Sequence, residues 1–231
     1  MILTVTLNPA IDRTVYVDNF KTGELNRVIA SRTDPGGKGI NVSKALCSYG
    51  VEQTATGIIG GMNGKQLMSL LERYDFRKDF LMISGETRVN LKINDIKTGL
   101  VTEVNESGPV VSEEDAEAFV NLLCKHLKNC ELLILSGSLP AGLPAGFYAR
   151  CIELASDMRV TSILDADGEA FSLGCRALPF AIKPNLCEFE RLTGKSFSNH
   201  GEIKEEIKSL NDAGIKLILV SLGREGSILG Y

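Results

Sequence analysis

The sequence predicts an α/β fold, namely a mostly parallel sheet with helices on both faces and a small lid built of β-strands. First, the second half of the chain alternates short apolar runs with helical apolar stripes, which is typical of a parallel sheet covered by helices. Second, these apolar runs end in small or polar residues, as strands do where ligands bind at their carboxyl ends. Third, the first half contains strand-like runs with no helix between them, which indicates a separate antiparallel extension.

Composition and charge exclude several classes of protein. The 231 residues are 44% apolar and 23% charged, as in globular proteins with a sizeable core, and we expect a single α/β domain over residues 1–231. A net charge of −4 without a Lys or Arg cluster argues against nucleic acid or an anionic membrane surface as the main partner. No apolar run reaches the roughly 18 residues that a membrane span needs.

Cysteine and histidine usage points to the cytoplasm and away from zinc. The six cysteines show no CxxC spacing, which predicts reduced thiols of a cytosolic protein. The two histidines lie far from any pair of cysteines, so a zinc site is not expected. The N-terminus has no basic region and no cleavage pattern, so no signal peptide is expected.

The first predicted strand, residues 2–7, is apolar and ends at Asn8. Asp12 follows closely, and we expect Asn8 and Asp12 to accept hydrogen bonds from a ligand or donate to it; the alternative is a turn that Asn and Asp side chains stabilise. Two further strands, over residues 14–17 and 27–31, are expected to form the antiparallel extension.

A glycine-rich turn over residues 34–43 leads directly into a helix. Gly36 and Gly37 suit a tight turn, and the apolar residues behind them recur with a helical period. A helix N-terminus offers unpaired N–H groups and the positive end of a dipole, and Lys38 and Asn41 add side-chain donors. We therefore expect a hydroxylated or anionic ligand here, against the alternative of a plain turn with a solvated lysine.

A second glycine-rich segment, residues 60–65, follows a strand predicted over residues 54–59. It lacks the spacing of a P-loop, which needs four residues between its first glycine and Gly-Lys and then Ser or Thr. We interpret it as a tight turn into a helix over residues 65–74.

Residues 88–94 alternate with period two, which predicts a strand with one apolar and one polar face. Arg88, Asn90 and Lys92 share the polar face, and arginine can hold a phosphate through two parallel hydrogen bonds. The pattern suits a flap over an anionic ligand, and an ordinary half-exposed strand is the alternative. This strand and its expected partner strand form one lid segment, at about residues 87–106. The antiparallel extension forms the other, at about residues 12–34.

From Ser112 onward, helices and strands alternate. Ser112 is expected to cap a helix whose first turn carries three acidic residues. Further helices begin near Phe147 and Cys187, and another contains Ile203. Strands are expected over residues 132–135, 160–164, 181–182 and 217–220. The residues that close these strands are expected to line one edge of the sheet, namely Ser136–Ser138, Asp165–Gly168, Lys183–Asn185 and Ser221–Gly223.

The order of these motifs resembles the PfkB branch of the ribokinase-like carbohydrate kinases. Six segments carry the resemblance in the family's order, namely Thr6–Asp12, Gly36–Asn41, Thr87–Asn90, Ser136–Pro140, Lys183–Glu188 and Ser221–Gly223. Within the family, the chain is most similar to the 1-phosphofructokinases and next to the tagatose-6-phosphate kinases. The resemblance covers essentially the whole chain. It implies a ribokinase-like fold and the ATP-dependent phosphorylation of a ketohexose phosphate, in first place fructose 1-phosphate to fructose 1,6-bisphosphate.

The resemblance also implies roles for individual residues. The sugar hydroxyls would be bound by Asp12, Gly36, Gly37, Lys38 and Asn41. The phosphate already on the substrate would be bound by Arg88, Asn90, Lys92 and Ser138. The nucleotide would be bound by Lys183, Asn185, Ser221 and Gly223. Mg²⁺ would be organised, largely through water, by Asn185 and Glu188.

The resemblance further implies a cytoplasmic enzyme that uses ATP and forms a homodimer through the lid. One motif departs from the family pattern: the Gly-x-Gly-Asp segment, which carries the anion hole and the catalytic aspartate, is absent before Tyr231. The resemblance places Asp165 and Asp167 at another strand end, so they do not replace that aspartate. We therefore expect an incomplete C-terminus and very slow turnover, or none, by these residues alone.

Two other classes of function are considered. A non-catalytic sugar-phosphate binder descended from such a kinase would bind its ligand without forming ADP. A dinucleotide oxidoreductase is disfavoured because no G-x-G-x-x-G follows the first strand. A kinase of neutral sugars or nucleosides is also disfavoured, because Arg88 and Lys92 would then lack a counter-charge.

Overall fold

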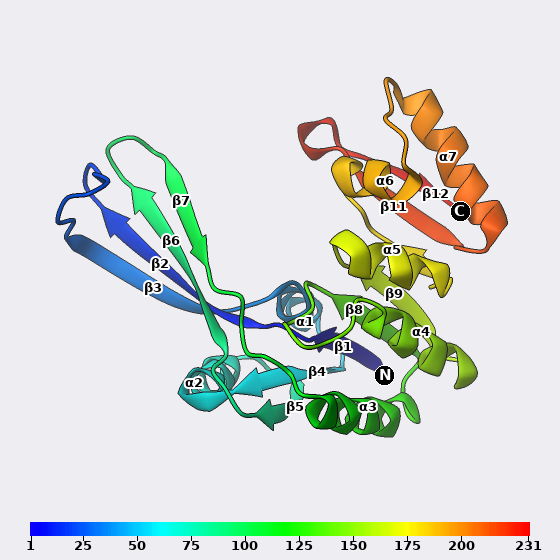
Figure 1. Cartoon of the computed structure of the whole chain (residues 1–231), viewed down its shortest axis with the longest axis horizontal. Coiled ribbons are helices and arrows are strands. Elements are labelled where there is room, and N and C mark those ends of the chain that lie inside the picture. The colour runs from blue at the N-terminus through cyan, green and yellow to red at the C-terminus, as the bar shows by residue number, and fades with distance from the viewer.

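The computed structural model describes all 231 residues and contains two sheets (Figure 1). The large sheet is built from β1 (Ile2–Thr6), β4 (Gln53–Gly60), β5 (Arg77–Ile83), β8 (Leu132–Ser136), β9 (Thr161–Asp165), β10 (Ala181–Ile182), β11 (Leu217–Ser221) and β12 (Ser227–Gly230). Its strand order is β12-β11-β10-β9-β8-β1-β4-β5. Only β12, at one edge, runs antiparallel to its neighbour, so the predicted parallel sheet is confirmed.

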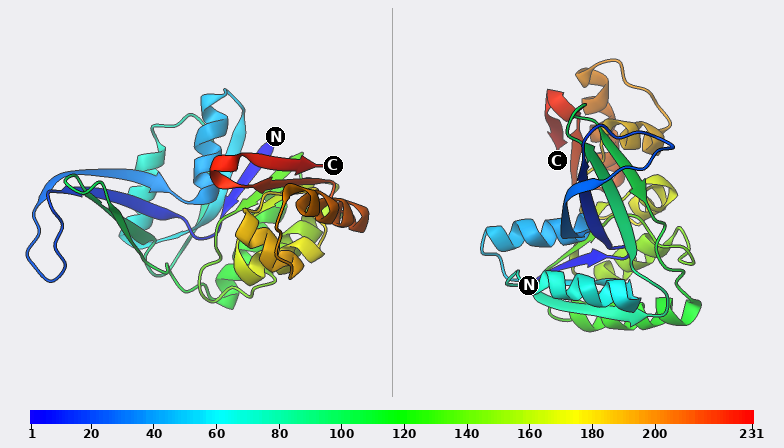
Figure 2. Two further views of the ribbon diagram at one scale, coloured as in Figure 1. Left: turned by 90° about the horizontal axis from the view of Figure 1, so that it is seen from above. Right: turned by 90° about the vertical axis from the view of Figure 1, so that its left-hand side faces the viewer.

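Helices cover both faces of the large sheet (Figure 2). On one face, α1 (Lys38–Ser48) and α2 (Gly61–Leu71) bury Ile40 and Leu67 against Ala55 and Ile59 of β4. The larger apolar core lies on the other face. It is formed with α3 (Glu113–Leu127), α4 (Phe147–Asp157), α5 (Gly168–Arg176), α6 (Leu186–Thr193) and α7 (His200–Ala213). The predicted α/β class with helices on both faces is therefore confirmed.

The start of α3 follows the predicted cap. The Ser112 hydroxyl accepts a hydrogen bond from the Asp115 N–H at 3.1 Å, and the Asp115 carboxylate in turn accepts one from the Ser112 N–H. This reciprocal arrangement satisfies two N–H groups that a helix start leaves free. No helix of the chain combines the length and the apolar character needed to cross a membrane.

The small sheet has four strands, β3 (Val28–Gly36), β2 (Ala10–Val17), β6 (Arg88–Asp95) and β7 (Val101–Asn105), in that order. The two predicted strand pairs therefore join into one sheet. The predicted antiparallel pairing is confirmed for β2 with β3 and for β6 with β7, whereas β2 and β6, which join the two pairs, are parallel. Both strands leave the large sheet in the same direction, β2 directly after β1 and β6 shortly after β5, so they run side by side.

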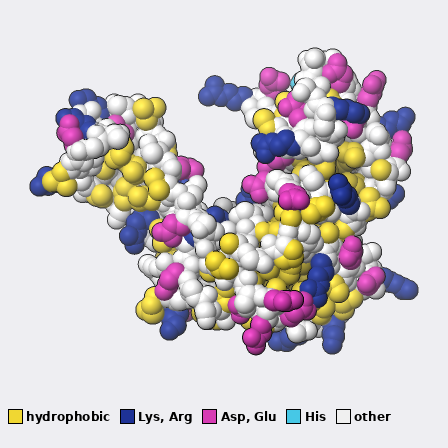
Figure 3. Space-filling model, viewed as in Figure 1, with side chains coloured by type: hydrophobic (Ala, Val, Ile, Leu, Met, Phe, Trp, Pro, Cys, Tyr) yellow, Lys and Arg dark blue, Asp and Glu magenta, His cyan; other side chains and the backbone are white.

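The small sheet projects from the carboxyl end of β1, since only Leu7, Asn8 and Pro9 separate β1 from β2. The chain returns to the large sheet at Gly36, directly before α1. Figure 3 shows a deep hollow between the small sheet and the C-terminal part of the molecule. The connections between the two sheets therefore lie next to the strand ends at which a ligand was expected.

Several elements differ from the sequence prediction, since β2 begins at Ala10 rather than at residue 14 and β3 continues to Gly36 rather than ending at residue 31. β5 and α5 were not predicted, because β5 begins with three charged residues and α5 is a short helix that carries two glycines. α2 begins at Gly61 rather than at residue 65. The Glu86 carboxylate accepts hydrogen bonds from the N–H groups of Met62 and Asn63 at 3.0 and 2.9 Å. A cap from so distant a residue lets the helix start earlier than the local sequence indicates.

Candidate active site

The polar residues that end neighbouring strands lie at one edge of the large sheet. Asp165 ends β9, and its carbonyl accepts a hydrogen bond from the Gly137 N–H behind β8 at 2.9 Å. Asn185, behind β10, forms a parallel bridge with Ser221 at the end of β11. The predicted edge of polar strand ends is therefore present, and it continues into the connections to the small sheet.

The glycine-rich turn packs closely against its neighbours. A Cβ atom on Gly36 would lie 2.3 Å from Oδ2 of Asp12, and one on Gly39 would lie 2.3 Å from the Thr6 hydroxyl. Gly37 has a φ of 117° and is the N-cap of α1, with no side chain that caps the first turn. The first N–H groups of α1 therefore stay available to a ligand.

Asp12 and Asn90 face the same side of the small sheet. They are paired in register on β2 and β6, and the Asn90 amide donates a hydrogen bond to Oδ1 of Asp12 at 3.0 Å. The side-chain oxygen of Asn90, Oδ1, is buried and has no hydrogen-bond partner. Leaving a buried polar atom without a partner costs free energy. A ligand group that donates a hydrogen bond, such as a sugar hydroxyl, would therefore suit this position.

Arg88 is held by two backbone carbonyls at the base of the small sheet. Its guanidinium donates to the Asn8 carbonyl at 2.9 Å and to the Glu106 carbonyl at 3.4 Å, whereas its Nε is buried without a partner. Burial lowers the pKa of Arg88, and the carboxylates of Asp12 and Asp167 act in the opposite direction. A fixed, half-buried cation with a free donor suits an anion such as a phosphate.

Asn8, which was predicted to face a ligand, joins this cation to the large sheet. Its side-chain amide donates to the Ser107 carbonyl at 3.0 Å and to the Ser138 hydroxyl at 3.4 Å, while its side-chain Oδ1 is buried without a partner. Ser138 is thereby brought next to the residues that hold Arg88. The polar end of an apolar strand was the only signal in the sequence for this residue.

Two lysines from different motifs meet at one carboxylate. Lys38, the first residue of α1, lies 3.4 Å from Oδ1 of Asp165, and Lys183, behind β10, lies 3.5 Å from Oδ2. Lys38 was predicted on the sugar side and Lys183 on the nucleotide side. The structure therefore brings the two predicted binding regions together around Asp165, which the sequence analysis had set aside.

Two predicted site residues make their side-chain contacts outside this cluster. Lys92 lies further out along the small sheet and pairs with Glu103 at 3.3 Å, so the expectation that it would lack a counter-charge is wrong. The charge comes from the neighbouring strand β7, which the spacing within one strand does not reveal. Asn41 is exposed on α1, and its side-chain oxygen accepts a hydrogen bond from Lys44 at 3.0 Å.

Three of the four predicted nucleotide residues line one cavity of about 390 Å³, whereas Lys183 does not. Asn185, Glu188, Ser221 and Gly223 all contribute to its wall. Asn185 caps α6, since its side-chain oxygen accepts from the Glu188 N–H at 2.9 Å while the Glu188 carboxylate accepts from the Asn185 N–H. This pair of reciprocal hydrogen bonds engages one oxygen of the Glu188 carboxylate and leaves the other free. The free oxygen fits Mg²⁺, which favours a carboxylate together with waters and phosphate oxygens, whereas the Asn185 oxygen is already engaged.

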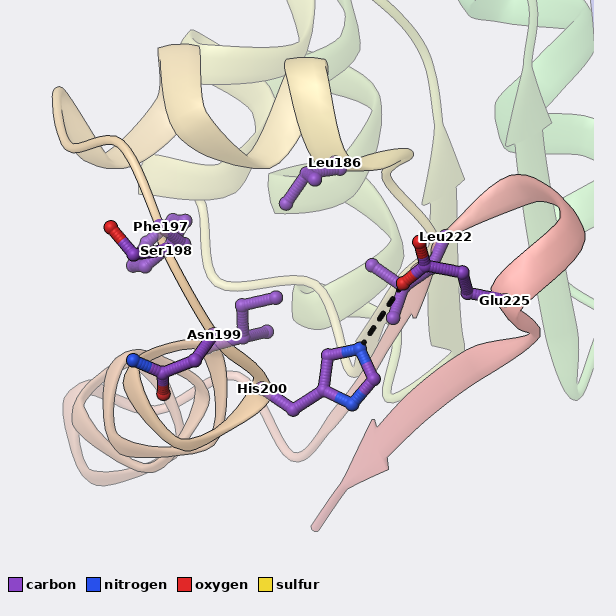
Figure 4. Close-up of a pocket in the computed structure, with 8 residues that line it drawn as sticks. Leu186, Phe197, Ser198, Asn199, His200, Leu222 and Glu225 are labelled. Atoms are coloured by element: carbon purple, nitrogen blue, oxygen red, sulfur yellow. Dashed lines mark ion pairs between the residues drawn. The ribbon is translucent and has the colours of Figure 1, made fainter.

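A second cavity of about 390 Å³ lies between α6, α7 and the turn after β11 (Figure 4). It shares Leu186 and Leu222 with the nucleotide-side cavity, and His200 lies 3.4 Å from Glu225 at its rim. None of the predicted site residues lines it.

Comparisons with known proteins agree with this arrangement. Residues 5–230 match the family described as pfkB family carbohydrate kinase. The chain is 35% identical to the 1-phosphofructokinase of Bacillus subtilis over 229 residues, which is 99% of this chain and 74% of that protein.

Solved structures show the same similarity in three dimensions. The phosphofructokinase-2 of Escherichia coli in complex with fructose-6-phosphate is 26% identical, with a TM-score of 0.92 over 99% of this chain and 76% of that one. Its tetrameric inhibited form gives a TM-score of 0.93 at 26% identity, over 99% and 76% of the two chains. The family match, the sequence identity and the shared fold together place the chain in the pfkB family of carbohydrate kinases, among its phosphofructokinase-type sugar kinases.

Proposed function

We propose that the chain transfers a phosphoryl group from ATP to a ketohexose phosphate, with fructose 1-phosphate as substrate and fructose 1,6-bisphosphate as product. The observation that carries the proposal is Arg88, whose guanidinium is fixed by two carbonyls and keeps a buried Nε without a partner. A substrate that carries a phosphate would supply the missing acceptor. The similarity to the 1-phosphofructokinase of Bacillus subtilis favours fructose 1-phosphate, and tagatose 6-phosphate is the alternative substrate.

On the sugar side, Asp12 accepts hydrogen bonds from substrate hydroxyls, and Gly36 leaves the room that its carboxylate needs. The bare backbone at Gly37 and the side chains of Lys38 and Asn41 offer donors. Arg88 binds the phosphate already present, with Ser138 and Asn90 next to it. Lys92, which pairs with Glu103, adds only its long-range charge.

On the nucleotide side, Lys183 approaches the phosphates of ATP, while Asn185, Ser221 and Gly223 line the cavity that receives the nucleotide. The free oxygen of the Glu188 carboxylate would hold Mg²⁺ through water. When bound, Mg²⁺ neutralises charge that develops on the phosphates during transfer.

The reaction joins the two sides of the site. A substrate hydroxyl attacks the γ-phosphorus, the bond from that phosphorus to the bridging oxygen of ADP breaks, and the hydroxyl proton passes to solvent. Phosphoryl transfer depends mainly on positioning and charge stabilisation, which Lys38 and Lys183 supply from opposite sides of the site.

We propose a single α/β domain over residues 1–231, in which segments 12–34 and 87–106 form a lid. The lid would close over the sugar and keep water from competing as acceptor. Its apolar outer face would pair with that of a second chain, giving a homodimer. The six free cysteines support a cytoplasmic protein.

The test compares binding and turnover for fructose 1-phosphate, fructose 6-phosphate and tagatose 6-phosphate. Binding is measured by calorimetric titration, and turnover by ADP release with ATP and Mg²⁺, on this chain and on one extended past Tyr231. We expect fructose 1-phosphate to bind most tightly and to give the fastest ADP release from the extended chain. Binding without ADP release from either chain would instead favour the non-catalytic sugar-phosphate binder.

Two matched variants test the role of Arg88. Arg88→Met removes charge-assisted hydrogen bonds worth about 1.5–3 kcal/mol, so the affinity for the sugar phosphate should fall by roughly one to two orders of magnitude. Lys92→Met removes the same charge from the same face of the same strand and should change the affinity little. Equal losses in both variants would contradict the assignment of the phosphate to Arg88.

A further inference from the structure

Asp165 is the point at which the sugar side and the nucleotide side of the site touch. Each of its two carboxylate oxygens faces a different lysine, Lys38 at 3.4 Å and Lys183 at 3.5 Å. The Asp165 side chain is only 14% exposed, whereas the two lysine side chains are 46% and 47% exposed. A mostly buried carboxylate thus lies between two cations that reach solvent.

This ion-pair cluster contributes little to the stability of the fold. Partly exposed ion pairs at such distances are worth about 0–1 kcal/mol, and holding each lysine costs side-chain entropy. The backbone of Asp165 is fixed without the carboxylate, through its pairing with Ser136 on β8 and the hydrogen bond from Gly137. No backbone N–H donates to the carboxylate, so its contacts are those with the two lysines.

Rigidity is distributed unequally within the cluster. Asp165 stands at the end of a strand inside the large sheet, whereas both ammonium groups sit on four-carbon side chains with many rotamers. The fixed partner therefore determines where the two mobile ones lie. A carboxylate presents two oxygens to the lysines much as a phosphate does, but it carries less charge.

We propose that Asp165 is a positioning residue that holds Lys38 and Lys183 where a nucleotide phosphate binds. When the phosphate binds, both lysines pair with it instead of with Asp165. The inference rests on the proposed kinase function and adds a residue to which no role was assigned. It has two opposite consequences. The carboxylate competes with the phosphate for the lysines, so it weakens ground-state binding, and it keeps the lysines aligned, so it supports turnover.

The primary test measures the affinity of the full chain for inorganic tripolyphosphate by calorimetric titration at low ionic strength. Asp165→Asn should bind tripolyphosphate roughly three- to tenfold more tightly than the unsubstituted chain, a gain of about 1 kcal/mol. The gain should shrink at high salt, because screening weakens partly exposed charges. Asp157→Asn, which makes the same charge change at the exposed end of α4, should leave the affinity unchanged.

A variant that lacks both lysines tests whether Asp165 acts through them. When Lys38 and Lys183 are both replaced by Met, Asp165→Asn should no longer strengthen binding. In the catalytically active chain, Asp165→Asn should lower both KM for ATP and kcat, and Asp165→Glu should restore part of kcat. A residue with a merely structural role would lower the midpoint of thermal unfolding without this division between KM and kcat.

The outcomes separate this inference from the proposed function. Equal or weaker tripolyphosphate binding by Asp165→Asn would overturn the role of Asp165, even if the chain proves to be a kinase. Tighter binding by Asp165→Asn, with no ADP release from the unsubstituted chain extended past Tyr231, would leave the role of Asp165 standing and overturn the kinase proposal. Failure of both proteins to bind tripolyphosphate would overturn the role of Asp165, and ADP release from the extended chain would still decide the kinase proposal.

Discussion

At the scale of single residues, the site depends on glycines, which have no side chain, as much as on residues that bind through their side chains. Gly36→Ala would place a Cβ atom 2.3 Å from the Asp12 carboxylate, which must then move away from Asn90. We expect sugar-phosphate affinity to fall by roughly tenfold or more, about 1.4 kcal/mol, measured by calorimetric titration. Gly146→Ala is the control, because nothing lies within 4 Å of its Cβ position and its φ of −77° suits any residue. Unchanged affinity in Gly36→Ala would refute the close packing of this turn.

Cysteine reactivity reports on the nucleotide-side cavity. Burial raises the pKa of Cys151 and of Cys175 to about 12, so both thiols stay protonated and unreactive at neutral pH. Cys187 is exposed and lines the cavity with Glu188 and Ser221. We expect a thiol-specific reagent, followed by mass spectrometry, to label Cys187 before Cys151 and Cys175, and ATP to slow that labelling. Labelling of Cys187 at the same rate with saturating ATP would place the nucleotide elsewhere.

At the scale of elements, Glu86, in the connection between β5 and β6, caps the start of α2, and this cap depends on pH. The N–H groups of Asn63 and Met62 lower the pKa of the Glu86 carboxyl below its ordinary value of 4.5. Its contribution to stability is therefore complete above that value and is lost as pH falls through the lowered pKa. We expect Glu86→Gln to lower the free energy of unfolding at neutral pH, and the difference to vanish in acid. Glu72→Gln, at the other end of α2, is the charge-matched control for these denaturant titrations.

Sequence and structure agree where an element's signals are local. The α3 helix was predicted because Ser112 and its acidic first turn lie within the helix start itself. α2 was predicted to begin too late because its cap, Glu86, is more than twenty residues away. The same reasoning holds for the site. Asp12 and Arg88 lie in sequence motifs, so the sequence alone could assign both to one ligand. The pairing of Lys92 with Glu103 could not be predicted, because it depends on the register of β6 and β7.

At the scale of the whole molecule, the small sheet has a polar face and an apolar face. The strand registers place Asp12, Asn90 and Lys92 on one face and Val15, Leu91, Ile93 and Val104 on the other. Figure 3 shows hydrophobic side chains gathered over this sheet, which projects from the rest of the molecule. An exposed apolar face of this kind is typical of a protein–protein interface, and a second copy of the chain presents a matching face.

The arrangement of β7 gives a matched test of the proposed homodimer. Val104 and Val101 are 55% and 56% exposed on the same strand, but they lie on opposite faces of the small sheet. Val104→Asp would bury a charge in the apolar interface, which is costly without a partner, so sedimentation velocity should show the dimer replaced by monomer. Val101→Asp changes the same residue type at similar exposure and should leave the dimer intact. Dissociation by Val101→Asp alone would assign the interface to the polar face, and a monomeric unsubstituted chain at micromolar concentration would refute the homodimer altogether.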